Sequence, residues 1–345
     1  VHRAYSKEFR KVGDTITIRK PATFTAQKFD RSAGVTLQNL TEGSVAVKLD
    51  HLIDVTFELT SEQRTLDIVS FSEQAIAPAM RAHAQYLDAL LAGLYVNIPY
   101  YTLYSTDTEA NKLADVAAID KIMSDNKVPV DSRYAVLSPA AKANYIVVPS
   151  FLNAEKRGDT QALKEASMGR IFTMDFYMDQ NIVKHAKGTL STASYYKGVI
   201  ATNTLQLATA SDTQTVKKGD IIQPKAGGTF FVILEDKTIT TTFADVAHYP
   251  AVDFDEAGAT TTINAVVNTD GRNNLAFHRN AFALVSAPLA PPMGGAQASV
   301  ETYKGASCRV VFGYDINKKV DTISIDMLVG VKTLTEELAV RLIGG

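Results

Sequence analysis

The sequence contains a single cysteine, Cys308, so it cannot form an intrachain disulfide or a zinc site made of several cysteines. So little cysteine is typical of a reducing compartment, and we expect synthesis in a cytosol. The longest uncharged apolar stretch, residues 89–104, is shorter than a membrane span and is broken by Asn97 and Pro99. The sequence therefore excludes a disulfide scaffold and predicts no transmembrane helix.

Motifs for catalysis, metals and cofactors are also missing. The chain has no Walker loop and no GxGxxG fingerprint, and its six histidines form no HxxxH or HxH pair. Residues 305–309 lack the second glycine of a nucleophile elbow, and residues 253–258 lack the closing glutamate of a calcium loop. Asp115 and Asp120 fall on different faces of a predicted helix, and we interpret them as solvated charges. We predict no catalytic residue, no metal site and no cofactor.

The composition indicates a globular protein with no strong preference for nucleic acid or membranes. Of 345 residues, 46% are hydrophobic, which is enough for one large or two moderate domains. Lys and Arg total 35 against 37 Asp and Glu, so we expect at most weak, nonspecific contact with DNA. Residues 1–31 differ, because basic residues outnumber acidic ones there.

Alternating apolar and polar residues predict three strands near the amino terminus. They cover residues 15–18, 45–49 and 55–59. Between the first two, residues 20–43 contain proline, glycines and asparagine among threonines and charges. We interpret this segment as a long exposed excursion between two paired strands.

Apolar spacing predicts two helices next. The first runs from about residue 72 to 96, and Pro78 places its true start nearer Ala77. A second helix is predicted over 108–124, followed by a buried strand within 133–139 and a short helix. The apolar stripe of the first helix consists of Ile76, Met80, Leu87, Leu90, Leu91 and Leu94.

Residues 191–270 differ from their surroundings. They are rich in threonine, they carry nine acidic residues against five lysines, and short β-type runs alternate with Gly and Asp turns. This composition predicts an acidic, all-β inserted domain. After it, residues 288–295 contain proline and glycine and should not join a sheet, whereas residues 308–328 predict a hairpin that turns at Asn317.

Four strings resemble the major capsid proteins of tailed bacteriophages, which have the HK97 fold, in the podovirus-type branch with an inserted β domain. They are VGDTITIRKP (12–21), RYAVLSP (133–139), NLAFHRNAFAL (274–284) and KTLTEELAVRL (332–342). They occur in the family's order and span nearly the whole chain. The resemblance implies an α+β fold with an axial domain, a peripheral domain containing a long spine helix, an extended hairpin called the E-loop, and the all-β insertion domain.

The resemblance also implies domain boundaries. The expected segments are the end of an N-terminal arm (1–11), the E-loop hairpin (12–60), the peripheral domain with the spine helix (61–107), the first part of the axial domain (108–190), the inserted β domain (191–270), the second part of the axial domain (271–295) and the C-terminal strands of the peripheral domain (296–345).

The implied function is structural. Such a subunit self-assembles into hexamers and pentamers of an icosahedral shell around the phage genome. Its implied partners are other copies of itself, a scaffolding protein, a portal protein at one vertex and, in some relatives, a decoration protein. Assembly is expected in the host cytoplasm and the mature protein in the virion. We expect the E-loop cations Arg19, Lys20, Lys28 and Arg31 to contact carboxylates on an adjacent subunit, with solvated loop charges as the alternative.

Two other functions compete with this one. An encapsulin-type bacterial compartment shares the shell fold but encloses enzymes, and such shells lack the β insert. An enzyme or carbohydrate-binding protein on a β-rich scaffold would fit the threonine-rich insert alone, and it would need a convergent polar pocket that the sequence does not demand.

Overall fold

The computed structural model describes most of the chain. The described residues are 15–20, 43–60, 75–104, 109–152, 168–199, 202–256, 261–267, 270–294, 297–303 and 306–344, with single positions at 24, 26, 28, 29, 31, 37 and 38. Contacts divide the chain into two compact units. Unit 1 contains Ala84–Phe282 and Thr335–Gly345, and unit 2 contains His2–His83 and Ala283–Leu334.

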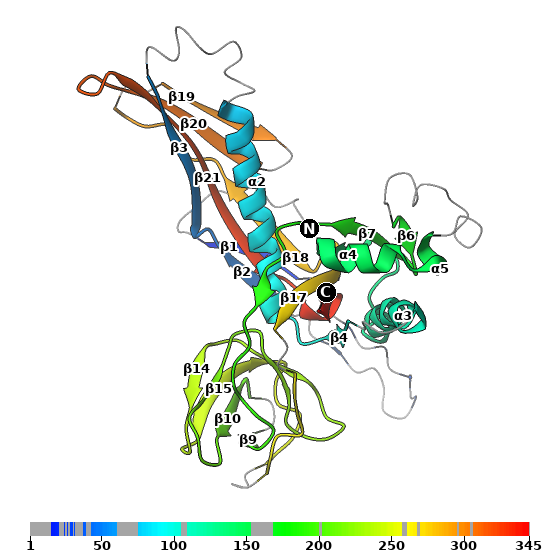
Figure 1. Cartoon of the computed structure of the whole chain (residues 1–345). Coiled ribbons are helices and arrows are strands. Elements are labelled where there is room, and N and C mark those ends of the chain that lie inside the picture. The colour runs from blue at the N-terminus through cyan, green and yellow to red at the C-terminus, as the bar shows by residue number, and fades with distance from the viewer. Residues whose placement is uncertain are drawn as a thin grey trace. The chain divides into compact units, whose positions relative to one another are not determined.

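Unit 2 is built on a long antiparallel sheet. Its central strand β21 (Val320–Thr333) pairs with β3 (His51–Thr60) along ten residues. Strand β20 (Ala306–Asp315) pairs with β21 and with the edge strand β19 (Gln297–Tyr303), and β18 (Phe282–Ala287) is a further neighbour of β21. Figure 1 shows these long strands side by side. The predicted hairpin at Asn317 is confirmed, because residues 316–319 form the turn between β20 and β21.

A second antiparallel pair in unit 2 comes from the amino-terminal strands. β1 (Thr15–Arg19) pairs with β2 (Ser44–Lys48), and the two flank the predicted excursion at 20–43. The three predicted strands are therefore confirmed. Most of the excursion lies outside the described residues.

The predicted spine helix is α2 (Ala77–Ala92), and a 3-10 helix, Gly93–Asn97, continues it. Its start at Ala77 confirms the inference from Pro78, since proline is tolerated only in the first turn. Residues 72–74 lie outside the described part of the chain.

The buried face of α2 differs from the predicted stripe. Met80 is 39% exposed, and the buried residues are Ala79 and His83. His83 can lie inside because its Nδ1 is 3.0 Å from the carbonyl oxygen of Ala79, one turn earlier. Ala79 and Met80 are neighbours in the sequence, so the apolar spacing alone does not show which of the two side chains faces the core.

Unit 1 contains a mixed seven-stranded sheet. The strands in order are β4 (Tyr101–Leu103), β22 (Ala339–Ile343), β17 (Gly271–His278), β5 (Arg133–Leu137), β7 (Met174–Met178) and β6 (Arg170–Ile171), with β8 (Lys184–His185) also paired to β17. The β22–β4 and β5–β7 pairs are parallel and the other pairs are antiparallel.

Helices cover one face of this sheet. α3 (Glu109–Asp125), α4 (Pro139–Ile146) and the short α5 (Pro149–Leu152) pack on it through a core that includes Ile119 and Tyr145. Ser138 caps α4, because its hydroxyl accepts a hydrogen bond from the backbone N–H of Ala141 at 3.2 Å. The second predicted helix and the buried strand before Pro139 are confirmed. None of the described helices is long and apolar enough to cross a membrane.

Between β8 and β17 the chain forms an all-β insert with its own core. The strands are β9 (Tyr195–Gly198), β10 (Thr204–Ala208), β11 (Gln214–Val216), β12 (Ile221–Gln223), β13 (Phe231–Ile233), β14 (Lys237–Ile239), β15 (Ala244–Tyr249) and β16 (Ala265–Val267). Six of them form one sheet in the order β16-β12-β13-β15-β10-β9. Two bridges join β9 to Glu256 and to Thr262, which lie before β16 in the chain, so the sheet curls back on itself.

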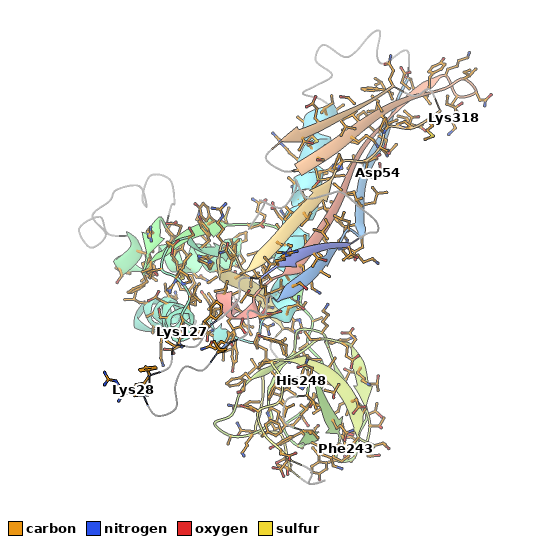
Figure 2. All side chains as sticks on the ribbon, turned by 180° about the vertical axis from the view of Figure 1, so that it is seen from behind. Lys28, Asp54, Lys127, Phe243, His248 and Lys318 are labelled. Carbon is orange, nitrogen blue, oxygen red and sulfur yellow. The ribbon has the colours of Figure 1, made fainter. Side chains whose placement is uncertain are left out.

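The interior of the insert is almost entirely apolar. Thirteen buried residues, among them Leu205, Phe231 and Val246, form a single cluster. His248 lies among them (Figure 2), with its ring edge-to-face on Phe231 at 4.8 Å. Burial lowers the pKa of His248, so this histidine is a neutral packing residue near pH 7.

The last residues of the chain join the seven-stranded sheet of unit 1. The expected peripheral segment 296–345 is divided, because β22 pairs with β17 in unit 1, whereas β19, β20 and β21 lie in unit 2. A 3-10 helix, Glu336–Leu338, precedes β22. Every residue of β22 is buried. The sequence of a strand that is buried on both faces does not indicate which of two sheets the strand joins.

Candidate assembly surfaces

The four cations predicted at subunit contacts lie on the segment that begins with β1. Ile18 and Val47 point inward and pack with Val285, so the alternating pattern directs Arg19 outward. Lys20 follows β1, and its backbone N–H donates to the Gly43 carbonyl at 2.6 Å. The side chain of Lys20 lies beside Gly43, because a Cβ at that glycine would be 3.6 Å from the Lys20 Cβ.

These cations are accessible in the single chain. Arg19, Lys28 and Arg31 are exposed and Lys20 is half-buried. Arg19 and Lys20 are consecutive residues at the end of β1, opposite Ser44 and Gly43. Lys28 and Arg31 lie further along the segment, at positions described singly. The four residues therefore lie on one segment of the chain. Their contacts with an adjacent subunit remain a prediction.

A second surface lies at the turn between β20 and β21, and sequence reasoning missed it. Phe312, Tyr314 and Ile316 are 40%, 52% and 69% exposed. Phe312 and Tyr314 share one face of β20 because they are two residues apart. Lys318, which Figure 2 labels at this end of the sheet, lies 3.8 Å from Glu58. Neighbouring exposed apolar side chains of this kind are typical of contact surfaces.

A row of polar side chains crosses the same long sheet. Arg309, Asp326 and Asp54 stand opposite one another on β20, β21 and β3. Arg309 pairs with Asp326, and the Ser324 hydroxyl lies 2.6 Å from Asp326 Oδ1 and 2.8 Å from Asp54 Oδ1. Burial opposes ionisation, but the hydrogen bonds from Ser324 and Arg309 outweigh it and hold the pKa of Asp326 below its usual value. This row holds three strands in register.

The interpretation of Asp115 and Asp120 as solvated charges is wrong. Asp115 is buried and accepts a hydrogen bond from the Tyr145 hydroxyl at 3.2 Å. Asp120 accepts from Arg133 Nη1 and from the Thr173 hydroxyl, each at 2.8 Å. The partners come from α4, β5 and the turn before β7, which no spacing within the helix could reveal. Both carboxylates therefore stabilise the fold.

The remaining candidate reactive groups also have structural surroundings. Burial raises the pKa of the Cys308 thiol, with a further contribution from Asp326, which disfavours the thiolate. Ser307 is hydrogen-bonded to Ser286 through its backbone N–H at 3.0 Å. Among the described residues, no three His, Cys, Asp or Glu side chains are grouped as a metal site would require. A pocket beside β4 is lined mainly by apolar and aromatic residues, including Tyr101 and Phe230.

Comparison with known families identifies the chain. The model that describes the P22 coat protein, gene protein 5, matches residues 5–194, more than half of the sequence. The chain belongs to the P22 coat protein family. This coat protein is a structural major capsid protein, and its family indicates a structural rather than a catalytic role. The matched part ends just before β9, the first strand of the β insert.

Solved structures show that the coat protein has the fold of phage capsid proteins. A chain of Mycobacterium phage Che8 is 13% identical with a TM-score of 0.56, and the match covers 99% of this chain and 88% of that one. The capsid proteins of cyanophage P-SCSP1u and Ralstonia phage GP4 are 12% and 10% identical, each with a TM-score of 0.52 and with 97% of this chain and 85% of theirs covered. No curated protein matches the sequence. The expected α+β, HK97-like fold is confirmed.

Proposed function

We propose that this coat protein assembles through hexamers and pentamers into the icosahedral shell that encloses a phage genome. The observation that carries the proposal is membership of the P22 coat protein family together with a capsid fold over nearly the whole chain. A shell subunit acts through extended surfaces. The accessible cations of the E-loop and the exposed apolar side chains of Phe312, Tyr314 and Ile316 fit that requirement.

The two compact units support an assignment of the expected capsid domains within the subunit. Unit 1, with the seven-stranded sheet and the β insert, would form the axial and inserted domains. Unit 2, with the long sheet and the β1–β2 hairpin, would form the peripheral domain and the E-loop. In this arrangement β22 adds the carboxyl-terminal strand to the axial domain.

The proposal includes the partners of such a shell. A scaffolding protein would direct assembly in the host cytoplasm, a portal protein would occupy one vertex, and a decoration protein would bind outside in phages that carry one. The near-neutral balance of 35 basic and 37 acidic residues supports an inner face that binds DNA weakly and lets it leave.

Reversing the four E-loop charges should block assembly. A variant with Arg19→Glu, Lys20→Glu, Lys28→Glu and Arg31→Glu is expected to lower the yield of closed shells about tenfold or more, because each weak ion pair becomes a repulsion that repeats around the shell. Light scattering and sedimentation at equal protein concentration measure the yield. Raising the salt concentration should lessen the difference between variant and parent, since exposed charges are screened.

The matched control keeps every charge. Arg19→Lys, Lys20→Arg, Lys28→Arg and Arg31→Lys change the same four positions and should assemble nearly as well as the parent chain. Equal yields from the reversed and the charge-conserving variants would show that these residues are solvated loop charges and make no subunit contact.

A further inference from the structure

The β insert joins the rest of unit 1 through a narrow stem. The chain enters it through β8 and leaves it through the start of β17, and the two strands pair with His185 opposite Gly271. Just beyond, the backbone N–H of Lys187 donates to Asp270 Oδ1 at 3.0 Å. A two-stranded connection holds two bodies together but restrains their relative orientation poorly. Other contacts must therefore fix the orientation of the insert.

A buried carboxylate of the insert is hydrogen-bonded to this stem. Asp220 is 1% exposed and accepts hydrogen bonds from the backbone N–H groups of Lys217 at 2.8 Å and Gly188 at 3.1 Å. Its Oδ1 is also 2.9 Å from Nε2 of His185, whose Nδ1 is 2.9 Å from the Tyr95 hydroxyl. A continuous hydrogen-bonded chain thus runs from the insert, through the stem, to the 3-10 helix that follows α2.

A buried cation of the seven-stranded sheet completes the junction. Arg341, on β22, is 1% exposed, and its Nη1 donates to the carbonyl oxygen of Gly219 at 2.8 Å. The guanidinium also lies 5.8 Å from the centre of the Tyr95 ring. Burial lowers the pKa of Arg341 to about 9, so the group is still a cation near pH 7. Arg341 is therefore a buried cation of the seven-stranded sheet that is hydrogen-bonded to the insert.

The turn that contains Gly219 fits closely against these groups. Its backbone has φ +99°, a conformation that favours glycine. A Cβ at this position would lie 3.1 to 3.3 Å from the side chains of Val96, His185 and Tyr95. The backbone of the insert thus approaches the 3-10 helix so closely that a side chain at this position would crowd its neighbours.

We propose that Tyr95, His185, Gly219, Asp220 and Arg341 form a latch that fixes the orientation of the insert on the seven-stranded sheet, with the stem as the hinge. The latch places one buried cation on the sheet and one buried anion on the insert, and neither is directly paired with the other. Opening the hinge would break the hydrogen bonds that Arg341 and Asp220 make across the junction and in the stem, and closing it restores them. The latch is a property of the single chain and does not depend on shell assembly.

Two further contacts join the insert to the rest of unit 1. The Tyr249 hydroxyl donates to Glu337 Oε1 at 2.6 Å, and the rings of Phe230 and Tyr101 meet edge-to-face at 5.1 Å. Loss of the latch alone should therefore increase the motion of the insert relative to the seven-stranded sheet. Loss of the latch together with Tyr249→Phe should increase this motion further.

Distance measurement between two spin labels tests the latch. Labels at Ser211→Cys on the insert and Ala143→Cys on α4, both exposed, are introduced in a Cys308→Ser background of the full chain. The parent should give a narrow distance distribution. Arg341→Met should roughly double its width, and Arg341→Met with Tyr249→Phe should widen it again.

Arg133→Met is the matched control. Arg133 is equally buried in the same sheet, but it donates to Asp120, Val128 and Pro129 and not to the insert. Arg133→Met should destabilise the sheet and leave the distance distribution narrow. An unchanged width in Arg341→Met, or an equal broadening in both variants, would overturn the latch.

Two milder variants cover the case in which Arg341→Met does not fold. Tyr95→Phe removes only the hydroxyl that bonds to His185, and Arg341→Lys keeps the charge. In both, hydrogen exchange at the amides of Gly188 and Lys217, which donate to Asp220, should become about tenfold faster than in the parent. Exchange at the parent rate in both variants would equally reject the proposal.

Discussion

Gly330→Ala is expected to lower the free energy of unfolding of unit 2 by about 3 kcal/mol and to prevent shell formation at 37 °C. Gly330 lies in β21, at the point where the backbone of β2 comes close to it. A Cβ there would overlap the carbonyl oxygen of Lys48 and would lie 3.0 Å from the Lys48 carbonyl carbon and 3.3 Å from Val47 Cγ1. Because the obstacle is backbone, no rotamer change relieves it. Urea unfolding followed by circular dichroism measures the loss.

Gly313→Ala is the control for this change. Gly313 lies in β20 of the same sheet, and the nearest atom to a Cβ there is the Thr322 carbonyl oxygen at 3.9 Å, an ordinary contact. This variant should stay within about 0.5 kcal/mol of the parent. If both alanines cost the same, the close approach of β2 to β21 at Gly330 is not present in solution.

Asn274→Ala should cost unit 1 about 3 kcal/mol, because one buried amide connects three segments. Its Oδ1 accepts from the backbone N–H of Ser138 at 2.6 Å, and its Nδ2 donates to the carbonyls of Gly344 at 2.9 Å and Leu342 at 3.3 Å. Alanine leaves these backbone groups without that partner in a buried site. The midpoint of thermal unfolding should fall, and hydrogen exchange should accelerate first in β22.

Asn264→Ala provides the comparison. Asn264 is exposed, and its Nδ2 donates to Gln223 Oε1 at 2.7 Å, a contact that water can replace. The change should be within about 0.5 kcal/mol of zero. An Asn274 variant as stable as the Asn264 variant would contradict the role given to Asn274 in holding the carboxyl-terminal strand.

Local patterns were sufficient to predict several elements of the fold. The alternation at 15–18 and 45–49 and the proline at position 78 reflect short-range rules, and the structure agrees with them closely. The pairing of β22 was not predictable in this way. A short strand that is buried on both sides carries no sign of which sheet it joins, and its partner β17 lies more than 60 residues away.

The groups that hold the molecule together were harder still to predict. Asp115, Asp120 and Arg341 look like ordinary charged residues in the sequence, yet each is held by partners from distant segments. The exposed face of Phe312 and Tyr314 was missed for a related reason, because alternation shows that two residues share a face but not whether another element covers it. The four E-loop cations were named as subunit contacts on the basis of the family resemblance. Their contacts with a neighbouring subunit remain a prediction.

Electron microscopy combined with sedimentation of the purified chain tests the central claim most directly. The chain would be expressed with and without the scaffolding protein of the same phage, and the particles imaged in negative stain. We expect closed shells, or rings of five and six subunits, in at least one of the two conditions. A stable monomer in both conditions would contradict a shell-building role.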